Sequence, residues 1–239
     1  MEAYTYSNLF DTKGIEYIVI IFFLLLLIPF WIVVNRKSEI ATKIEEAFQT
    51  LTAAVLTIPR GLFFSRNHTW LYLEKSGEAK VGIDDFMLKV LGDVRVKPVK
   101  SAQEKVKKGE VVALLEQAGK QLKLRSPISG EISRFNFEQT EDFAETAVDP
   151  YGSGWILTIQ PDNWKAETSE FLLGHEIMPW MEKELQRLKD FLNVTFARQS
   201  GAAFAPVFQE GGELQMNPLA ELNAEVWNDF QNEFLEKTE

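Results

Sequence analysis

Residues 111–130 read VVALLEQAGKQLKLRSPISG, and this stretch decides the fold. An apolar run is followed by a short polar turn, a second run and a Ser-Pro-x-Ser-Gly turn. Runs of this length bounded by turn residues predict a β-hairpin, with strands over 111–115 and 122–124. Gly119 lies in the turn between them, and glycine adopts the positive φ that tight hairpin turns require.

Short apolar segments separated by polar turns surround this hairpin. We expect further strands over residues 70–73, 79–83, 94–99, 130–135 and 155–159. A short helix is expected over 85–91, with Asp84 and Asp85 as turn and helix-cap residues. Short strands joined by polar turns are typical of a small β-sandwich or flattened barrel, so the region is predicted to be mainly β.

Several motifs resemble the glycine cleavage system H protein, a family that carries lipoate on a lysine at a hairpin tip. They are His68-Thr69-Trp70, 81–86 (VGIDDF), 91–93 (LGD), 106–109 (VKKG) and 149–155 (DPYGSGW). They cover roughly residues 62–165 in the family's order and close to its spacing. Gln103 stands where the family usually has a glycine in a tight turn. The resemblance implies a lipoyl/biotinyl-carrier type of fold.

The same resemblance locates the position at which a lipoyl group would be attached. In the family a Glu-Ser-x-Lys motif precedes a Pro-x-Ser-Gly turn at fixed spacing. Aligned without gaps through Glu116 and Pro127, the lysine's position is taken by Gly119, and Lys120 follows one residue later. A shift of one residue along a hairpin turns the side chain to the other face, and the spacing on both sides fixes the register.

Two interpretations of Lys120 follow. In the first, Lys120 is an ordinary solvated turn residue, no lipoate is attached, and the domain binds or holds other proteins. In the second, the register differs slightly and Lys120 carries lipoate. Lys123 is a poorer candidate because it lies within the return strand. A biotin-type carrier usually has a Met-Lys-Met tip, which 118–121 (AGKQ) lacks.

An uncharged apolar run precedes the β-rich region. Residues 17–34 read YIVIIFFLLLLIPFWIVV, which is nearly long enough to span a hydrocarbon core of about 30 Å. The acidic flank before it and the lack of an Ala-x-Ala site argue against a cleaved signal peptide. We therefore expect a transmembrane helix over 17–35. Arg36, Lys37 and Lys43 follow the run, so the positive-inside rule places residues 1–16 outside and the rest in the cytoplasm.

Helical patterns flank the β-domain, which we bound at 62–166. Within the connecting segment 36–61, an amphipathic helix is expected over 38–57, packed either on the β-domain or on a membrane partner. In the tail, 167–239, helices are expected over 171–191 and 219–234, and 201–218 reads as a loop. The first tail helix would turn one apolar side inward, formed by Met178, Met181, Leu185, Leu188 and Leu192.

Charge is concentrated in the tail. Residues 168–239 hold 13 acidic and 5 basic side chains, a net of −8 out of −10 for the chain. Nucleic-acid binding needs phosphate neutralisation by Lys and Arg, so this balance argues against a nucleic-acid partner. The acidic surface is either a solvated face or a docking face for a basic protein. The second tail helix has an apolar stripe with four-residue spacing, formed by Leu222, Val226, Phe230 and Phe234. Trp227 on the same helix is expected to be exposed beside that stripe, which favours an interface.

No catalytic or metal-binding motif is evident. The chain has no cysteine, and its two histidines, His68 and His175, fall in different segments. We therefore expect no catalysis, no metal site and no cofactor, with lipoate on Lys120 as the alternative. The predicted protein is a single-pass protein of the inner membrane, an accessory subunit that docks other subunits of a membrane redox or transport complex. The alternative is a membrane-tethered lipoyl carrier.

Overall fold

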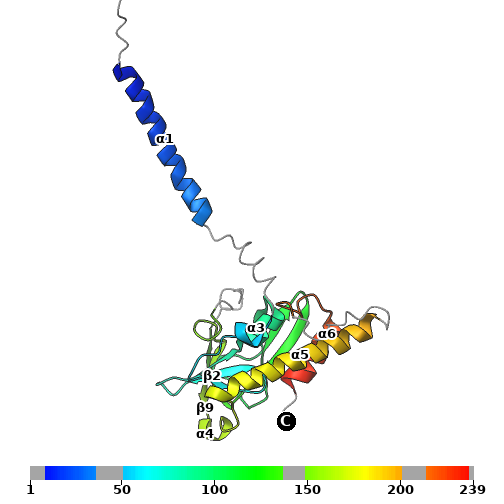
Figure 1. The fold of residues 1–239 in the computed structure, drawn as a ribbon. Coiled ribbons are helices and arrows are strands. Elements are labelled where there is room, and N and C mark those ends of the chain that lie inside the picture. The colour runs from blue at the N-terminus through cyan, green and yellow to red at the C-terminus, as the bar shows by residue number, and fades with distance from the viewer. Residues whose placement is uncertain (1–8, 36–50, 137–148, 201–213, 237–239) are drawn as a thin grey trace, which may run out of the picture. The chain divides into compact units, whose positions relative to one another are not determined.

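The computed structural model describes residues 9–35, 51–136, 149–200 and 214–236 (Figure 1). The chain divides into two compact units, Met1–Phe48 and Gln49–Glu239. Each unit is considered by itself.

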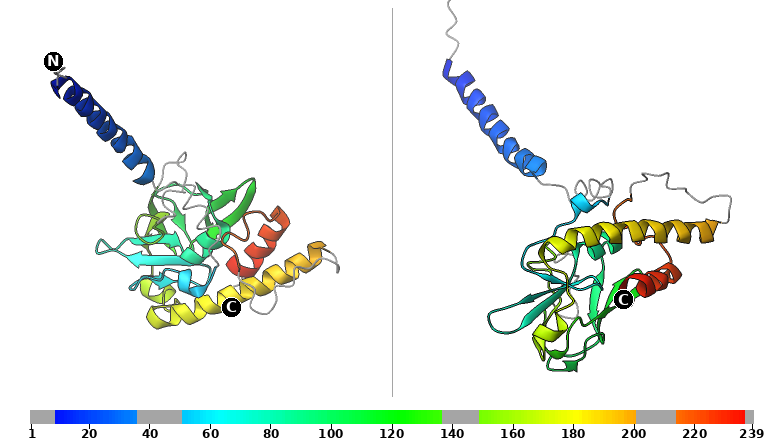
Figure 2. Two further views of the ribbon diagram at one scale, coloured as in Figure 1. Left: turned by 45° about the horizontal axis from the view of Figure 1, so that its top comes forward. Right: turned by 60° about the horizontal axis from the view of Figure 1, so that its bottom comes forward.

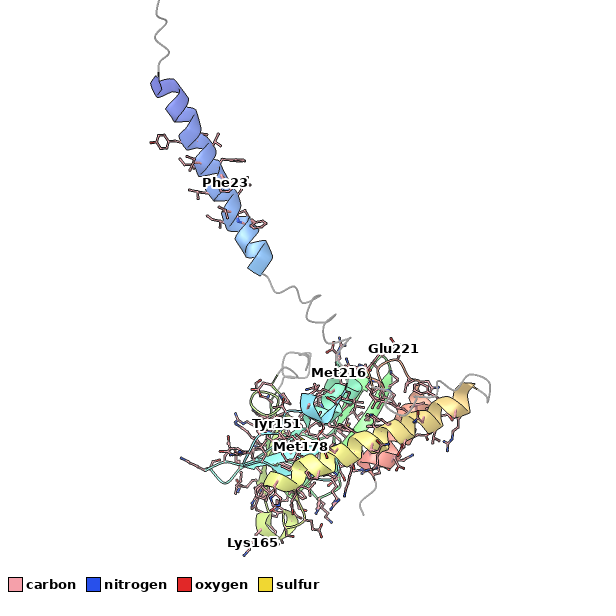
Figure 3. All side chains as sticks on the ribbon, viewed as in Figure 1. Phe23, Tyr151, Lys165, Met178, Met216 and Glu221 are labelled. Atoms are coloured by element: carbon pink, nitrogen blue, oxygen red, sulfur yellow. The ribbon has the colours of Figure 1, made fainter. Side chains whose placement is uncertain are left out.

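The first unit contains a single described helix, α1, Leu9–Asn35. Side chains are described for residues 17–30, and they extend from all sides of the helix around Phe23 (Figure 3). The large apolar side chains among them are 38% to 67% exposed. A helix thus forms where the sequence predicts one. Across the part of the chain that the structure describes, no helix is long and apolar enough to cross a membrane, so the predicted transmembrane character is not confirmed.

The second unit is built on two antiparallel sheets. The larger sheet has the strand order β1-β2-β3-β9-β8-β5, and the smaller has the order β4-β6-β7. The strands of the larger sheet are β1 (Phe63–Phe64), β2 (Thr69–Leu73), β3 (Ala79–Ile83), β5 (Lys105–Val106), β8 (Gly130–Phe135) and β9 (Leu157–Pro161). Those of the smaller sheet are β4 (Arg95–Pro98), β6 (Val111–Gln117) and β7 (Lys120–Arg125). The mainly β architecture and the seven predicted strands are confirmed, and β1 and β5 are additional.

Buried side chains on the inner faces of the strands form one core with the helices. Trp70 on β2 is fully buried opposite Gly82 on β3, its register partner. A Cβ atom at Gly82 would lie 2.6 Å from the Trp70 ring, so only glycine permits this packing. The predicted short helix is also confirmed as α3, Asp85–Leu91, and Asp84 caps it by accepting a hydrogen bond from Met87 N at 2.9 Å.

Helices follow the last strand in the C-terminal region. They are α4 (Trp164–Glu167), η3 (Gly174–Glu176), α5 (Ile177–Ser200), α6 (Ala224–Phe230) and the π-helical turn η4 (Gln231–Leu235). The long helix α5 runs along the β-sheets (Figure 2). The ring of Phe191 on α5 contacts Phe230 and Phe234, so α5 packs directly on the C-terminal end of the described chain.

The first tail helix begins later than the predicted residue 171. Leu172 instead pairs with Phe64 of β1 through two backbone hydrogen bonds of 3.0 and 2.9 Å, and Gly174 has a positive φ of 60°. An extended segment therefore precedes α5. The residues predicted to form the buried face of α5 are buried except for Met178, which is 40% exposed. Trp180, Glu184 and Thr195 on the same helix are also buried.

The second tail helix is shorter than the predicted 219–234. Backbone hydrogen bonds from Asn217 N to Lys89 O and from Leu219 N to Val90 O hold the preceding segment against the end of α3. The helix can start only after Asn223, whose side chain caps α6 by accepting from Val226 N at 3.0 Å.

Two predicted segments lie largely outside the described residues. Of the helix expected over 38–57, only 51–57 is described, and it contains one 3-10 turn, η1, Ala53–Val55. Leu51 and Leu56 of that part are buried in the core of the second unit, which agrees with packing on the β-domain. Of the predicted loop 201–218, residues 214–218 are described.

Candidate functional site at the β6–β7 hairpin

The β6–β7 hairpin closes through a two-residue turn formed by Ala118 and Gly119. Gln117 pairs with Lys120, and Leu115 pairs with Leu122. Both turn residues have positive φ, 47° for Ala118 and 80° for Gly119, which is the pattern of a type I′ turn. Among the described residues other than its two chain neighbours, none has a heavy atom within 4 Å of where a Cβ of Gly119 would project. The space beside Gly119 at the hairpin tip is therefore open, and Gly119 presents no side chain there.

Lys120 is the first residue of β7 and is not an ordinary solvated turn residue, which corrects the sequence-based expectation. Its Nζ donates to Ala220 O at 2.6 Å and to Leu222 O at 3.0 Å. The same Nζ lies 4.8 Å from the ring centroid of Trp227. Burial lowers the pKa of Lys120. The amine that the alternative interpretation would modify is held by the C-terminal tail.

The tail also covers the outer edge of β7. Lys123 N donates to Gln231 Oε1 at 2.6 Å, and Gln231 Nε2 donates back to Lys123 O at 3.3 Å. Two residues further along β7, Arg125 Nη2 donates to Glu236 Oε1 at 2.7 Å. β7 lies at the edge of the three-stranded sheet, and the Gln231 amide therefore satisfies two backbone groups that would otherwise be unpaired.

Trp227 anchors this contact. It is 1% exposed, which corrects the expectation of an exposed aromatic ring. Its indole Nε1 donates to Leu219 O at 2.9 Å, and its face receives the Lys120 ammonium. The four-residue spacing predicted an apolar stripe correctly but could not show which partner the stripe would cover. Trp227 covers the hairpin of the chain itself, whereas Phe230 and Phe234 of the stripe pack on Phe191 of α5.

A second polar connection between tail and β-domain is centred on His68. The side chain is completely buried, with Nδ1 2.8 Å from Asp84 Oδ2 and Nε2 3.5 Å from Glu184 Oε2 on α5. The second distance is that of an ion pair rather than a well-formed hydrogen bond. The imidazole stacks between the rings of Phe86 and Trp180, at centroid distances of 4.6 and 5.0 Å.

The charges around His68 decide its protonation. Burial alone would lower its pKa, but the charge of Asp84 and the contacts with Asp84 and Glu184 outweigh burial and raise the pKa to about 9. For Glu184, burial would raise the pKa, but the contacts with His68 and Arg187 lower it. His68 is thus a buried cation between two carboxylates. The sequence suggested neither partner, because Glu184 lies 116 residues away on an acidic helix.

Arg187 extends this connection to the end of the tail. Its Nη1 bonds both carboxylate oxygens of Glu184 at 2.7 and 2.8 Å, and its Nη2 donates to Glu233 O at 2.7 Å. The guanidinium also lies 4.6 Å from the ring centroid of Phe234. The β-domain, α5 and η4 are therefore joined by one continuous set of polar contacts.

The seven-residue string 149–155 forms the turn before β9. The Asp149 carboxylate accepts hydrogen bonds from Gly152 N and Ser153 N at 3.0 and 3.2 Å. Tyr151, labelled in Figure 3, packs on the rings of Phe64 and Trp70 and accepts a hydrogen bond from Asp85 N at 3.0 Å. This motif stabilises the domain and contributes no side chain to the hairpin tip.

Comparison with known proteins matches this domain to one family. The family model described as "Glycine cleavage H-protein" matches residues 62–184. The probable glycine cleavage system H protein of Pyrococcus abyssi is 32% identical over 115 residues, which cover 48% of this chain and 85% of that protein. The glycine cleavage system H protein of Halorhodospira halophila is 34% identical over 113 residues, 47% of this chain and 84% of the relative.

Among solved structures, a crystal structure of a glycine cleavage system H protein from Mycobacterium marinum is similar at 30% sequence identity. The similarity covers 50% of this chain and 94% of that one, with a TM-score of 0.44. The family match reaches into α5 and includes Glu184, beyond the boundary near residue 165 that the motifs indicated. The chain belongs to the glycine cleavage H-protein family.

Proposed function

We propose that the protein is a membrane-anchored H-protein-like accessory subunit without a lipoyl group, which docks other subunits of a membrane redox or transport complex. The main support for this proposal is the structure of the hairpin tip. Its apex residue is Gly119, and the neighbouring Lys120 amine is bonded to two carbonyl oxygens of the tail. A carrier arm needs a free amine at an exposed apex, and this hairpin has none there.

Acylation of Lys120 would conflict with its contacts. An amide has one N–H donor and no charge, so it could not satisfy both Ala220 O and Leu222 O or keep the cation–π contact with Trp227. The tail would have to leave the hairpin before the arm could be attached. We therefore infer that the family's carrier function has been replaced by a binding function.

The anchor is proposed from the N-terminal sequence. The uncharged run over 17–34 and the exposed apolar side chains of 17–30 would be stabilised by contact with lipid. Arginine and lysine follow the run at 36 and 37, which favours the inner membrane with the β-domain in the cytoplasm. Carbonate extraction of native membranes tests this step, because a peripheral protein would be released and an anchored one would not.

One alternative remains open for a specific reason. Burial lowers the pKa of Lys120, and a lysine with a lowered pKa is a better nucleophile at neutral pH. If a partner displaced the tail, Lys120 could be acylated and the protein would act as a membrane-tethered lipoyl carrier. That alternative requires the modifying enzyme to accept a lysine on the strand rather than at the apex.

A lipoylation assay separates the two functions. The wild-type chain, Gly119→Lys and Lys120→Ala would each be incubated with lipoate, ATP and a lipoate ligase, and their intact masses measured. We expect no addition to the wild type and one lipoyl group on Gly119→Lys, because the space around the Gly119 Cβ position is open and the strain of positive φ at a lysine costs only about 1–2 kcal/mol. Lipoylation of the wild type that is lost in Lys120→Ala would establish the carrier function instead.

A further inference from the structure

A cavity of about 710 Å³ lies at the opposite end of β7 from the hairpin tip. Five segments surround it: the loop between β1 and β2, the turn after β5, the turn after β7, the segment following α4, and the end of the tail. Its volume falls in the range of small-molecule sites, which is about 300–1,000 Å³. Such a convergence of separate segments is typical of a binding site.

Three cationic side chains line this cavity: Arg66, Lys108 and Arg125. Two carboxylates, Glu170 and Glu236, line it as well, so the charged side chains that the described residues contribute to the lining sum to +1. A ligand with a single negative charge would neutralise the site. A dianion such as phosphate would be left with excess negative charge against the two carboxylates.

The three cationic side chains differ in the hydrogen bonds and ion pairs that they already make. Arg125 donates to Gly109 O at 2.9 Å and to Glu236 at 2.7 Å, and Lys108 lies 3.8 Å from Glu170 Oε2 and donates to Glu167 O at 3.4 Å. Arg66 is exposed, and no hydrogen bond or ion pair joins it to another described residue. Its planar guanidinium is therefore available for a two-point contact with a carboxylate.

The remaining wall is partly apolar. Phe171, Leu235 and Pro127 line the cavity beside the charged groups, and the Lys108 ammonium lies 5.4 Å from the Phe171 ring centroid. A site that combines one available guanidinium with an aromatic and aliphatic wall favours a ligand with a charged end and an apolar body.

We propose that this cavity is a binding site for a small monocarboxylate with a compact apolar body, held by Arg66 and assisted by Arg125. Neither the hairpin tip nor Lys120 lines this cavity. The result for ligand binding is therefore independent of whether the protein is lipoylated. The Glu236 carboxylate already accepts a hydrogen bond from Arg125, so it competes with the carboxylate of the ligand for that guanidinium.

Saturation-transfer NMR on the full-length chain tests the proposal, with 4-phenylbutyrate as the probe. The primary amide of 4-phenylbutyrate is the uncharged control, and inorganic phosphate is the anionic control without an apolar body. We expect saturable phenylbutyrate binding with a dissociation constant on the order of 1 mM, in keeping with the ligand efficiency of small ligands. The amide and phosphate should each bind at least about tenfold more weakly, because the first lacks the charge and the second the apolar body.

Variants identify the residues. Arg66→Gln should weaken phenylbutyrate binding about tenfold, whereas Arg60→Gln, an exposed arginine outside the cavity, should leave it unchanged. Glu236→Gln should tighten binding several-fold by freeing Arg125. Equal binding of acid and amide, stronger binding of phosphate, or full binding by Arg66→Gln would each overturn the proposal. Circular dichroism of each variant confirms that it is folded.

Discussion

Replacing Lys120 with methionine measures how far the tail depends on this side chain. Methionine keeps most of the aliphatic chain and removes the ammonium group. In the folded protein that group donates to Ala220 O and Leu222 O and lies over Trp227. The variant therefore leaves two carbonyl oxygens without their donor while the rest of the hairpin is unchanged.

The magnitude follows from these contacts. A hydrogen bond that involves a charged group contributes about 1.5–3 kcal/mol, and a cation–π contact at a partly exposed site about 0.5–1 kcal/mol. Lys120 is only half-buried, so solvent screens these interactions, and burial of the ammonium offsets part of them. We expect a net loss of about 2 kcal/mol in the stability of the tail on the hairpin.

Two measurements check this value on the full-length chain. Urea denaturation followed by tryptophan fluorescence reports the free energy of unfolding, because Trp70, Trp180 and Trp227 are buried in the folded protein. Hydrogen exchange of residues 214–236 reports local release of the tail. Lys123→Met is the matched control, since its side chain is exposed on the same strand. The reasoning fails if Lys120→Met matches Lys123→Met in both measurements.

Three further outcomes are expected. The folded pKa of about 9 for His68 lies above its ordinary 6.5, so its stabilisation of about 3 kcal/mol is fully present below pH 6.5 and is lost as pH rises through 9. Denaturation at pH 6 to 10 should show this fall in the wild type and not in His68→Gln. Gly82→Ala should lower the melting temperature markedly, because the added methyl group would overlap the Trp70 ring. Met181→Ala should cost about 2–4 kcal/mol and Met178→Ala less than about 0.5 in denaturation experiments, because only Met181 is buried.

The strands and the short helix of the β-domain could be predicted from the sequence because the patterns that specify them involve neighbouring residues. Strands β3 and β8 and helix α3 have the predicted bounds, and Asp84 caps α3 as its position before an apolar run suggests. Gln103 has a positive φ of 67°, which explains why a glycine is usual at that position in the family. Each of these features depends on a few adjacent residues.

The contacts of the tail could not be predicted in the same way. Periodicity identified the apolar face of α5 and the spacing of Val226, Phe230 and Phe234, but periodicity does not name the surface that a helix covers. Trp227 and Lys120 are 107 residues apart in sequence, and only the folded chain brings them together. The assignment of both as solvent-facing residues was wrong for that reason.

Intact-mass spectrometry of the protein purified from its native source, without overexpression of any ligase, tests the central claim most directly. A mass equal to that of the unmodified polypeptide is the predicted result, because the hairpin apex is a glycine and the adjacent amine is held by the tail. A mass greater by one lipoyl group, located at Lys120 by fragmentation, would contradict the account and make the protein a carrier.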